Sequence, residues 1–167
     1  MIKEGARYHV TARANRKEMI LDSSRMKDLF LEVVKRAKEK YDFRIENFCI
    51  MGNHFHFIIQ PMKDASLSDI MRWIMSVFAM TWNRINHLTG HVWGERFFSR
   101  IIQTFGEYIR VFGYIDENPV EAKQVSDIFK WRYGGLRHVR EGCRDIVDKI
   151  PEWITILFPR YSSLKLN

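Results

Sequence analysis

Cysteine and long apolar runs are both scarce in this sequence. Its 167 residues include only 2 cysteines, which cannot build a disulfide framework and which suit a reducing compartment. The most apolar region, residues 70–82, is interrupted by Arg72 and is too short to span a bilayer. The N-terminus has no apolar stretch of the kind that opens a secretion signal. These absences predict a cytoplasmic protein without a membrane partner.

The composition also excludes disorder and low complexity. Hydrophobic residues make up 46% of the chain and charged residues 28%, which is typical of a globular protein. A chain of 167 residues is long enough to bury a core and has the length of one domain. We expect a single domain over residues 1–167, in which residues 123–167 form a basic C-terminal extension.

Acidic residues are in the minority. The chain has 27 Lys and Arg residues against 20 Asp and Glu residues, so its formal net charge is +7. The excess is concentrated in residues 7–17 and 130–144, whereas residues 61–120 carry no net charge. Such clusters can attract a polyanion such as nucleic acid. A solvated basic surface explains the charge alone equally well.

Hydrophobic periodicity and turn signals predict alternating strands and helices. Alternating and β-branched stretches predict strands over residues 8–14, 44–51, 54–60 and 97–103. Apolar residues at helical spacing behind Ser or Thr caps predict helices over residues 24–40, 66–86 and 104–118, the last ending before Pro119. The order β-α-β-β-α-β matches the split βαβ, ferredoxin-like arrangement. We therefore expect an α+β fold with an antiparallel sheet, followed by a C-terminal tail.

Two histidines in the third predicted strand form the strongest chemical feature. In His54-Phe55-His56 the imidazoles are two residues apart, so they point to the same face of the strand. Two imidazoles side by side can form half of a metal site. Alternatively, one histidine caps the turn at Gly52-Asn53 and the other is merely exposed.

A polar stripe on the third predicted helix is the second feature. Arg110, Tyr114 and Asn118 follow one another at intervals of four residues and therefore share a helix face. Each also has an ordinary structural explanation. Tyr114 can lie at the edge of the core, Asn118 can cap the helix end, and Arg110 can be a solvated charge.

Four segments in register resemble a known family. They are residues 8–13 (YHVTAR), 51–59 (MGNHFHFII), 94–100 (GERFFSR) and 114–122 (YIDENPVEA). In this order and spacing the chain resembles the HUH single-tyrosine transposases, and among them the REP-associated tyrosine transposases. The resemblance implies an HUH endonuclease-like fold and a metal-dependent enzyme that cleaves and rejoins single-stranded DNA, as in DNA transposition and recombination.

The resemblance also implies a set of site residues. His54 and His56 would bind a divalent metal ion, Mg²⁺ or Mn²⁺, with Asn118 as the third ligand. Tyr114 would be the nucleophile and would form a 5′-phosphotyrosine intermediate. The DNA would bear a hairpin, the protein would be nucleoid-associated, and it would act as a monomer or as a homodimer.

Basic and aromatic residues are candidates for contacts with DNA. The candidate phosphate-binding residues are Arg7, Arg13, Arg16, Lys17, Arg96, Arg100, Arg110 and Arg132. Aromatic side chains on which unpaired bases could stack are Trp93, Phe97, Phe98 and Trp131. Core packing is the alternative for these aromatics, and it is favoured more for Phe97 or Phe98 than for Trp93.

Two other functions are compatible with the same residues. One is a non-catalytic module with an RRM-like sheet, in which aromatics stack on bases and the histidines are incidental. The other is a metal-dependent hydrolase that uses His54 and His56 with water as the nucleophile. Only the transposase hypothesis predicts a covalent adduct between Tyr114 and DNA.

Overall fold

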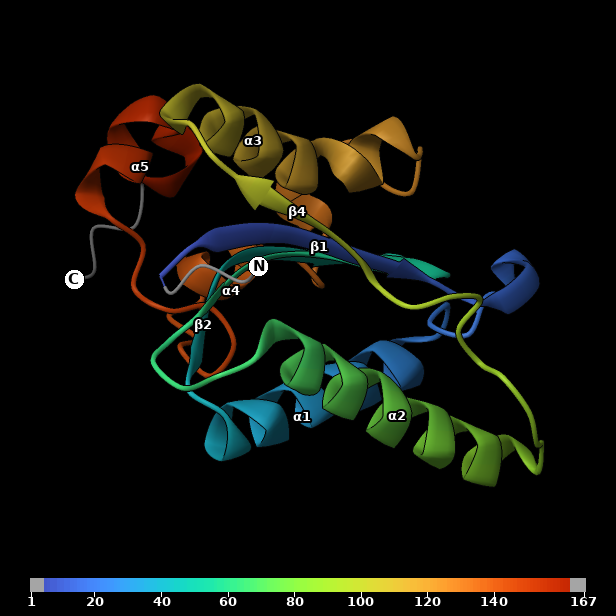
Figure 1. Ribbon diagram of the computed structural model, residues 1–167. Helices are drawn as coiled ribbons and strands as arrows, with labels where there is room; N and C mark the ends of the chain where they lie inside the picture. Colours follow the sequence, from blue (N-terminus) through green and yellow to red (C-terminus); the bar gives the residue numbers. More distant parts are fainter. Residues whose placement is uncertain (1–4, 163–167) are drawn as a thin grey trace.

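A sheet of antiparallel strands lies at the centre of the molecule (Figure 1). The computed structural model describes residues 5–162. The strands are β1 (Arg7–Arg13), β2 (Phe43–Ile50), β3 (His54–Pro61) and β4 (Phe98–Ile102), and their order across the sheet is β2-β3-β1-β4. This order, with β1 and β3 in the interior, confirms the predicted ferredoxin-like α+β fold.

Helices cover both faces of the sheet (Figure 1). Helices α1 (Ser24–Lys40) and α2 (Leu67–Asn86) lie on one face, and α3 (Phe105–Glu121) lies across the other. Successive side chains of β3 point to opposite faces of the sheet, so alternate residues of this strand face α1 and α3. Phe55 packs on Phe30 of α1, with ring centroids 4.9 Å apart, so the histidines on either side of Phe55 face α3.

Side-chain caps start the three long helices as the sequence predicted. The hydroxyl of Ser66 accepts a 3.3 Å hydrogen bond from the Asp69 amide, and that of Thr104 accepts a 3.1 Å bond from the Glu107 amide. Such a cap satisfies one of the amides that a helix leaves unbonded at its start.

The end of α3 differs from the prediction. The helix continues past Asn118 to Glu121 with Pro119 inside it, and Ala122 rather than Asn118 is the C-cap. The Ala122 amide donates to the Asn118 carbonyl at 2.9 Å, so the final turn closes although proline has no amide to donate. Asn118 and Pro119 are both buried, and this packing outweighs the local preference for a break.

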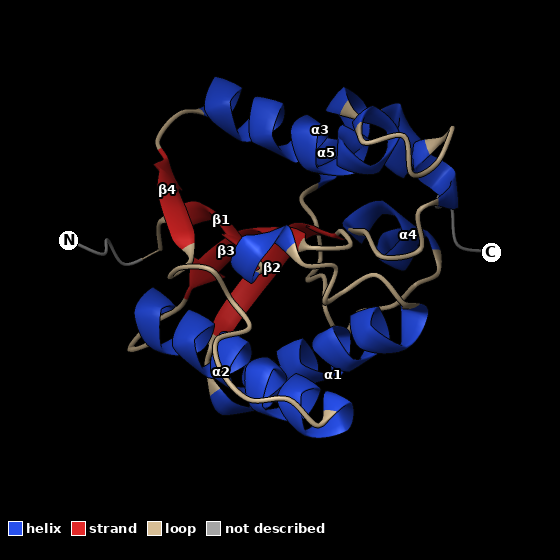
Figure 2. Ribbon diagram, turned by 90° about the vertical axis from the view of Figure 1, so that its right-hand side faces the viewer, coloured by secondary structure: helices blue, strands red, loops and turns tan. Residues whose placement is uncertain are grey.

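The C-terminal segment packs onto the same core. Helix α4 (Gly135–Arg140) lies at the β2 edge of the sheet and α5 (Glu152–Leu157) lies beside α3 (Figure 2). Gly134 forms a backbone bridge with Cys49 of β2. The segment buries the side chains of Tyr133, Leu136, Val139, Ile146, Val147, Ile154 and Tyr161. The described part of the predicted extension therefore contributes to the core.

Within residues 5–162, no helix has both the length and the apolar character that crossing a bilayer requires.

Candidate active site

The two histidines of β3 lie side by side on the face that α3 covers. The ring centroids of His54 and His56 are 5.1 Å apart, and the rings are nearly perpendicular. Their strand is hydrogen-bonded on both sides, to β1 and to β2, so its backbone is held firmly in the interior of the sheet. The prediction that His54 and His56 point to the same face of their strand is confirmed.

Helix α3 brings Tyr114 onto this pair. The Tyr114 ring stands edge-on to the His56 ring, with centroids 5.4 Å apart and planes at 90°. The tyrosine is 41% exposed, so it is open to solvent on its other side. A phenol that touches an imidazole and also faces solvent is accessible to a ligand at the same point.

Asn118 lies one helical turn after Tyr114 and reaches the other histidine. Its side chain hydrogen-bonds to His54, and the residue is buried. The spacing of four residues on α3 thus places the tyrosine against one imidazole and the amide against the other. Four predicted site residues from two distant segments therefore meet on one sheet face.

A turn residue orients His54. The Asn53 amide nitrogen donates to the Lys17 carbonyl at 3.2 Å, and the Asn53 side-chain oxygen lies 2.7 Å from Nδ1 of His54. An amide oxygen only accepts hydrogen bonds, so Nδ1 of His54 carries the proton. Nε2 of a neutral His54 then keeps its lone pair. From the sequence, Asn53 was assigned only to a turn.

A third imidazole, His9 of β1, also lies in the site and was missed. Its Nε2 atom is 3.1 Å from Nδ1 of His56, and the two ring centroids are 5.3 Å apart. Alternation along β1 places His9 on the face opposite Tyr8 and Val10, which are buried in the core. That alternation was readable in the sequence. The pairing of β1 with β3, which brings His9 to His56, was not.

The histidines are held in their neutral form. The pKa of His54 is lowered to about 4, chiefly by burial and also by the positive charge of Arg13, while the bond to Asn118 opposes the shift. The pKa of His56 is lowered to about 3, chiefly by burial and also by repulsion from His54, His9 and Arg13. Neutral imidazole is the form that binds metal ions.

The donor set fits a divalent cation. Within residues 5–162, Nε2 of His56 is buried and has no hydrogen-bond partner. A buried acceptor without a partner is unfavourable in a protein interior, and a cation would satisfy it. The imidazole nitrogens and the Asn118 oxygen suit Mn²⁺, and Mg²⁺ takes the oxygen ligand more readily than the nitrogens.

A second group of potential ligands lies elsewhere in the molecule. Atoms of His138, Cys143 and Asp145 are within 4.8 Å of one another near α4. The Asp145 carboxylate already pairs with the Lys35 ammonium at 2.5 Å. This group shares no residue with the site beneath α3.

Four of the predicted phosphate-binding residues line one groove beside the site. The groove has a volume of about 360 Å³ and runs along the end of β1 towards the 94–96 loop. Its basic residues, drawn from separate segments, are Arg13, Arg16, Lys17 and Arg96. Arg13, which lines the groove, is paired in register with His54 of β3.

The backbone of this groove is strained. Arg16 and Lys17 both have positive φ values, 50° and 59°, in a short 3₁₀ turn, η1 (Asn15–Lys17). Such a conformation costs a non-glycine residue on the order of 1 kcal/mol. The bond from Asn53 to the Lys17 carbonyl holds the turn, and the same asparagine contacts His54. Asn53 therefore holds both the turn that lines the groove and the ring of His54 in place.

The remaining predicted basic residues are dispersed or already paired. Both carboxylate oxygens of Glu46 lie 2.9 Å from Nε of Arg7. Arg100 pairs with Glu107 at 3.0 Å but stays 69% exposed. Arg110 is exposed on α3. Arg132 lies 3.9 Å from Asp28 of α1, outside the groove.

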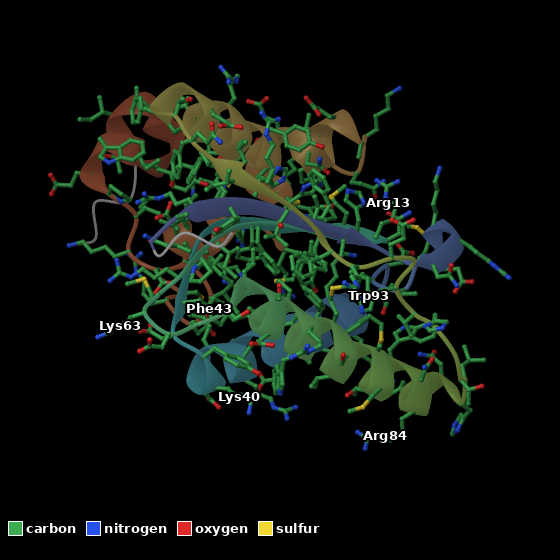
Figure 3. All side chains as sticks on the ribbon, viewed as in Figure 1. Arg13, Lys40, Phe43, Lys63, Arg84 and Trp93 are labelled. Carbon is green, nitrogen blue, oxygen red and sulfur yellow. The ribbon has the colours of Figure 1, made fainter. Side chains whose placement is uncertain are left out.

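The expectation for the aromatic residues was wrong for Trp93. Trp93 is 9% exposed, packs among the phenylalanines beneath the sheet, and donates from its indole to the Met75 carbonyl at 2.9 Å. Phe98, for which core packing was favoured, is 62% exposed and lines the basic groove. The loop that carries Trp93 folds back onto α2, which the local sequence does not reveal (Figure 3).

The fold and the site together define a class of protein. It is a ferredoxin-like domain in which a histidine pair on the sheet faces a tyrosine and an amide on one covering helix. Residues 3–118 match the model of the IS200-like transposases, and the chain belongs to this family.

Individual proteins resemble this chain over most of its length. A Haemophilus influenzae protein assigned as a REP-associated tyrosine transposase is 23% identical over 117 residues, which are 64% of this chain and 66% of that protein. The chain thus spans just under two thirds of this relative. A solved REP-associated tyrosine transposase bound to a REP hairpin has a TM-score of 0.70 at 21% identity, with 91% of both chains covered.

A second solved structure is more distant. A crystal structure assigned as a transposase from Deinococcus radiodurans has a TM-score of 0.50 at 12% identity, and covers 70% of this chain and 97% of its own. At these identities the structural matches show a shared fold. The first match extends over 91% of the chain, so it includes most of the C-terminal segment.

Proposed function

We propose that this protein cleaves and rejoins single-stranded DNA, with Tyr114 as the nucleophile. The observation that carries the proposal is the contact between Tyr114 and His56, whose ring centroids are 5.4 Å apart although they come from different elements. A purely structural role for Tyr114 at the edge of the core does not account for the neighbouring pair of neutral imidazoles.

His54, His56 and Asn118 would hold a divalent metal ion, Mg²⁺ or Mn²⁺. When bound, the ion would polarise the scissile phosphate and offset the charge that develops on it. His54 is oriented for this purpose by Asn53, and the burial of His56 excludes water from its free nitrogen. The protein thereby supplies neutral nitrogen ligands that do not need to lose a proton first.

Tyr114 would perform the covalent step. Its phenolic oxygen attacks the phosphorus, the bond from phosphorus to the 3′-oxygen breaks, and the DNA 5′-phosphate becomes joined to the tyrosine. The phenolic proton passes to solvent, to which Tyr114 is open, and the departing 3′-oxygen takes up a proton. Attack by another 3′-hydroxyl reverses these changes and releases the tyrosine. The phosphodiester energy is conserved, so rejoining requires no nucleotide cofactor.

The basic groove would guide the DNA strand to the tyrosine. Arg13, Arg16, Lys17 and Arg96 can contact consecutive phosphates, and the exposed Phe98 ring can stack on an unpaired base. A hairpin-bearing strand is the substrate that we favour, since a protein with the same fold is bound to a REP hairpin.

The decisive experiment looks for the covalent adduct. Labelled single-stranded DNA carrying a hairpin is incubated with the full chain and Mg²⁺ or Mn²⁺, and the products are separated on a denaturing gel. We expect a metal-dependent band of protein joined to DNA that disappears in Tyr114→Phe. Tyr41→Phe is the matched control, because Tyr41 lies at the end of α1, on the far side of the sheet, and should retain the adduct.

Other outcomes identify the competing functions. Cleavage without an adduct that persists in Tyr114→Phe would indicate a hydrolase with water as the nucleophile. Tight binding without cleavage, across varied hairpins, would indicate a non-catalytic module. An RRM-like module needs an open sheet face for stacking, whereas α3 covers the face that carries the histidines. This cover argues against the binding module.

A further inference from the structure

His9 is placed to control which nitrogen of His56 is free. Nε2 of His9 and Nδ1 of His56 are 3.1 Å apart, and the planes of the two rings are within 18° of parallel. His9 is paired in register with Ile58, two residues after His56, so the two imidazoles are diagonal neighbours on adjacent strands. This contact is made by rigid interior strands and not by a loop.

One of these two nitrogens donates and the other accepts. If His9 were the donor, the proton of a neutral His56 would be on Nε2, a buried position without a partner among residues 5–162. If His56 is the donor, its proton is on Nδ1 and its Nε2 presents a lone pair. Only the second arrangement lets Nε2 bind a cation.

The geometry points to His9 as a positioning residue that accepts the Nδ1 hydrogen of His56 and thereby keeps Nε2 of His56 free to bind the metal. This inference rests on the proposed metal site and adds to it a residue that is not itself a ligand. Partners that fix the tautomer of a ligating histidine strengthen metal binding.

The other histidine of the pair has a corresponding partner. Asn53 accepts from Nδ1 of His54 at 2.7 Å, so the lone pair of a neutral His54 is on Nε2. The two histidines are thus oriented by two acceptors from different elements, a turn residue for His54 and a β1 residue for His56. The same arrangement at both positions is what a two-nitrogen metal site requires.

His9 also contacts the tyrosine, which decides how its role must be tested. The His9 and Tyr114 ring centroids are 6.3 Å apart, with the rings edge to face. Replacing His9 can therefore disturb the tyrosine as well as the metal site, and DNA cleavage alone would not separate these effects. Metal binding to the protein without DNA does separate them.

The experiment measures Mn²⁺ binding by the full-length protein, using calorimetry and the paramagnetic resonance signal of free Mn²⁺. We expect His9→Leu to weaken binding on the order of 10-fold to 100-fold, because it removes the acceptor. We expect His9→Gln to stay within about threefold of the unmodified protein, since the glutamine oxygen can occupy the place of Nε2. Nitrogen NMR of the metal-free protein should show the His56 proton on Nδ1.

Two control variants show what unchanged Mn²⁺ binding and abolished Mn²⁺ binding look like in this measurement. Ile58→Val perturbs the packing beside His9 without removing a hydrogen bond, and its Mn²⁺ affinity should not change. His56→Ala removes a proposed ligand and should abolish binding at this site. Circular dichroism on every variant establishes that the chain is folded.

Three results would overturn the inference. The first is unchanged Mn²⁺ binding in His9→Leu while His56→Ala no longer binds the ion. The second is an equal loss of affinity in His9→Leu and His9→Gln with the His56 tautomer unaltered, which would make His9 a ligand itself. The third is a His56 proton found on Nε2. Unchanged binding in His56→Ala would instead refute the proposed metal site, so the two failures are distinguishable.

Discussion

The carboxylate of Asp116 pairs with the guanidinium of Arg160, with Oδ2 and Nη2 2.9 Å apart. Asp116 lies on α3 two residues after Tyr114, and Arg160 lies in the 3₁₀ turn η3 (Pro159–Tyr161). Asn47 of β2 and the Tyr161 hydroxyl donate to the same carboxylate at 2.9 and 2.8 Å. The tyrosine helix is therefore joined to the sheet and to the C-terminal segment through one buried carboxylate.

Removing the cation from this pair should strongly destabilise the protein. The Asp116 side chain is 1% exposed; burial raises the pKa of its carboxyl, and Arg160 opposes that rise. We expect Arg160→Leu to lower the free energy of unfolding by about 3 kcal/mol, measured by urea denaturation, because a buried carboxylate loses its charge partner. Arg137→Leu, which breaks an exposed pair with Glu141, should cost less than about 1 kcal/mol. Equal destabilisation of the two variants would contradict this prediction.

The neutral histidines should make stability depend on pH. The pKa of His56 is about 3 in the folded protein, against about 6.5 for an unperturbed histidine, so the unfolded chain binds a proton that the folded chain excludes. The free energy of unfolding of the metal-free protein should fall as the pH falls below about 6.5, by up to about 1.4 kcal/mol per pH unit for this group.

A comparison with His56→Gln isolates this contribution. Urea denaturation at about pH 7 and pH 5 should show a smaller loss of stability in the variant, since glutamine does not titrate. The same slope in both proteins would show that His56 is not the group responsible.

The basic groove predicts how DNA affinity responds to salt. Replacing Arg13 or Arg96 with Gln should weaken binding of single-stranded DNA and reduce the magnitude of the logarithmic salt slope by about 0.7 for each phosphate that is no longer neutralised. Lys40→Gln and Arg84→Gln are matched controls, because both residues lie below the sheet, far from Arg13 (Figure 3). Fluorescence anisotropy over a salt series measures the slopes. If the controls lower the slope as much as the groove variants, DNA binding is not specific to the groove.

Substitutions of the buried Trp93 and of the exposed Phe98 should have opposite effects on stability and on DNA binding. Trp93→Ala should destabilise the fold by roughly 3–5 kcal/mol, because it empties part of the core. Phe98→Ala should change stability by less than about 0.5 kcal/mol, and should weaken DNA binding by about 1–3 kcal/mol if a base stacks on the ring. Urea denaturation measures the stability of both variants, and fluorescence anisotropy measures their affinity for DNA. A Phe98→Ala protein that binds DNA normally would exclude the stacking role.

Local patterns predicted most of the elements and which candidate site residues share a face. A period of two places His54 and His56 on one strand face, and a spacing of four places Tyr114 and Asn118 on one helix face. Serine and threonine caps predicted where the helices start. These features depend on residues close together in the chain, and for that reason they could be read without coordinates.

The errors of prediction all concern long-range contacts. α3 continues through Pro119 because its last turn is buried, and Trp93 is in the core because its loop packs on α2. His9 was overlooked because its role depends on the register between β1 and β3. None of these contacts has a local signal.

The sequence by itself determined the order of strands and helices, the paired histidines and the tyrosine helix, because backbone periodicity and capping act over a few residues. Only the tertiary structure decided that His9 meets His56, that four basic residues share one groove, and that Asp116 joins the tyrosine helix to the C-terminal segment. Such contacts follow from the packing of surfaces distant in the chain, and their free energy is distributed over the whole core.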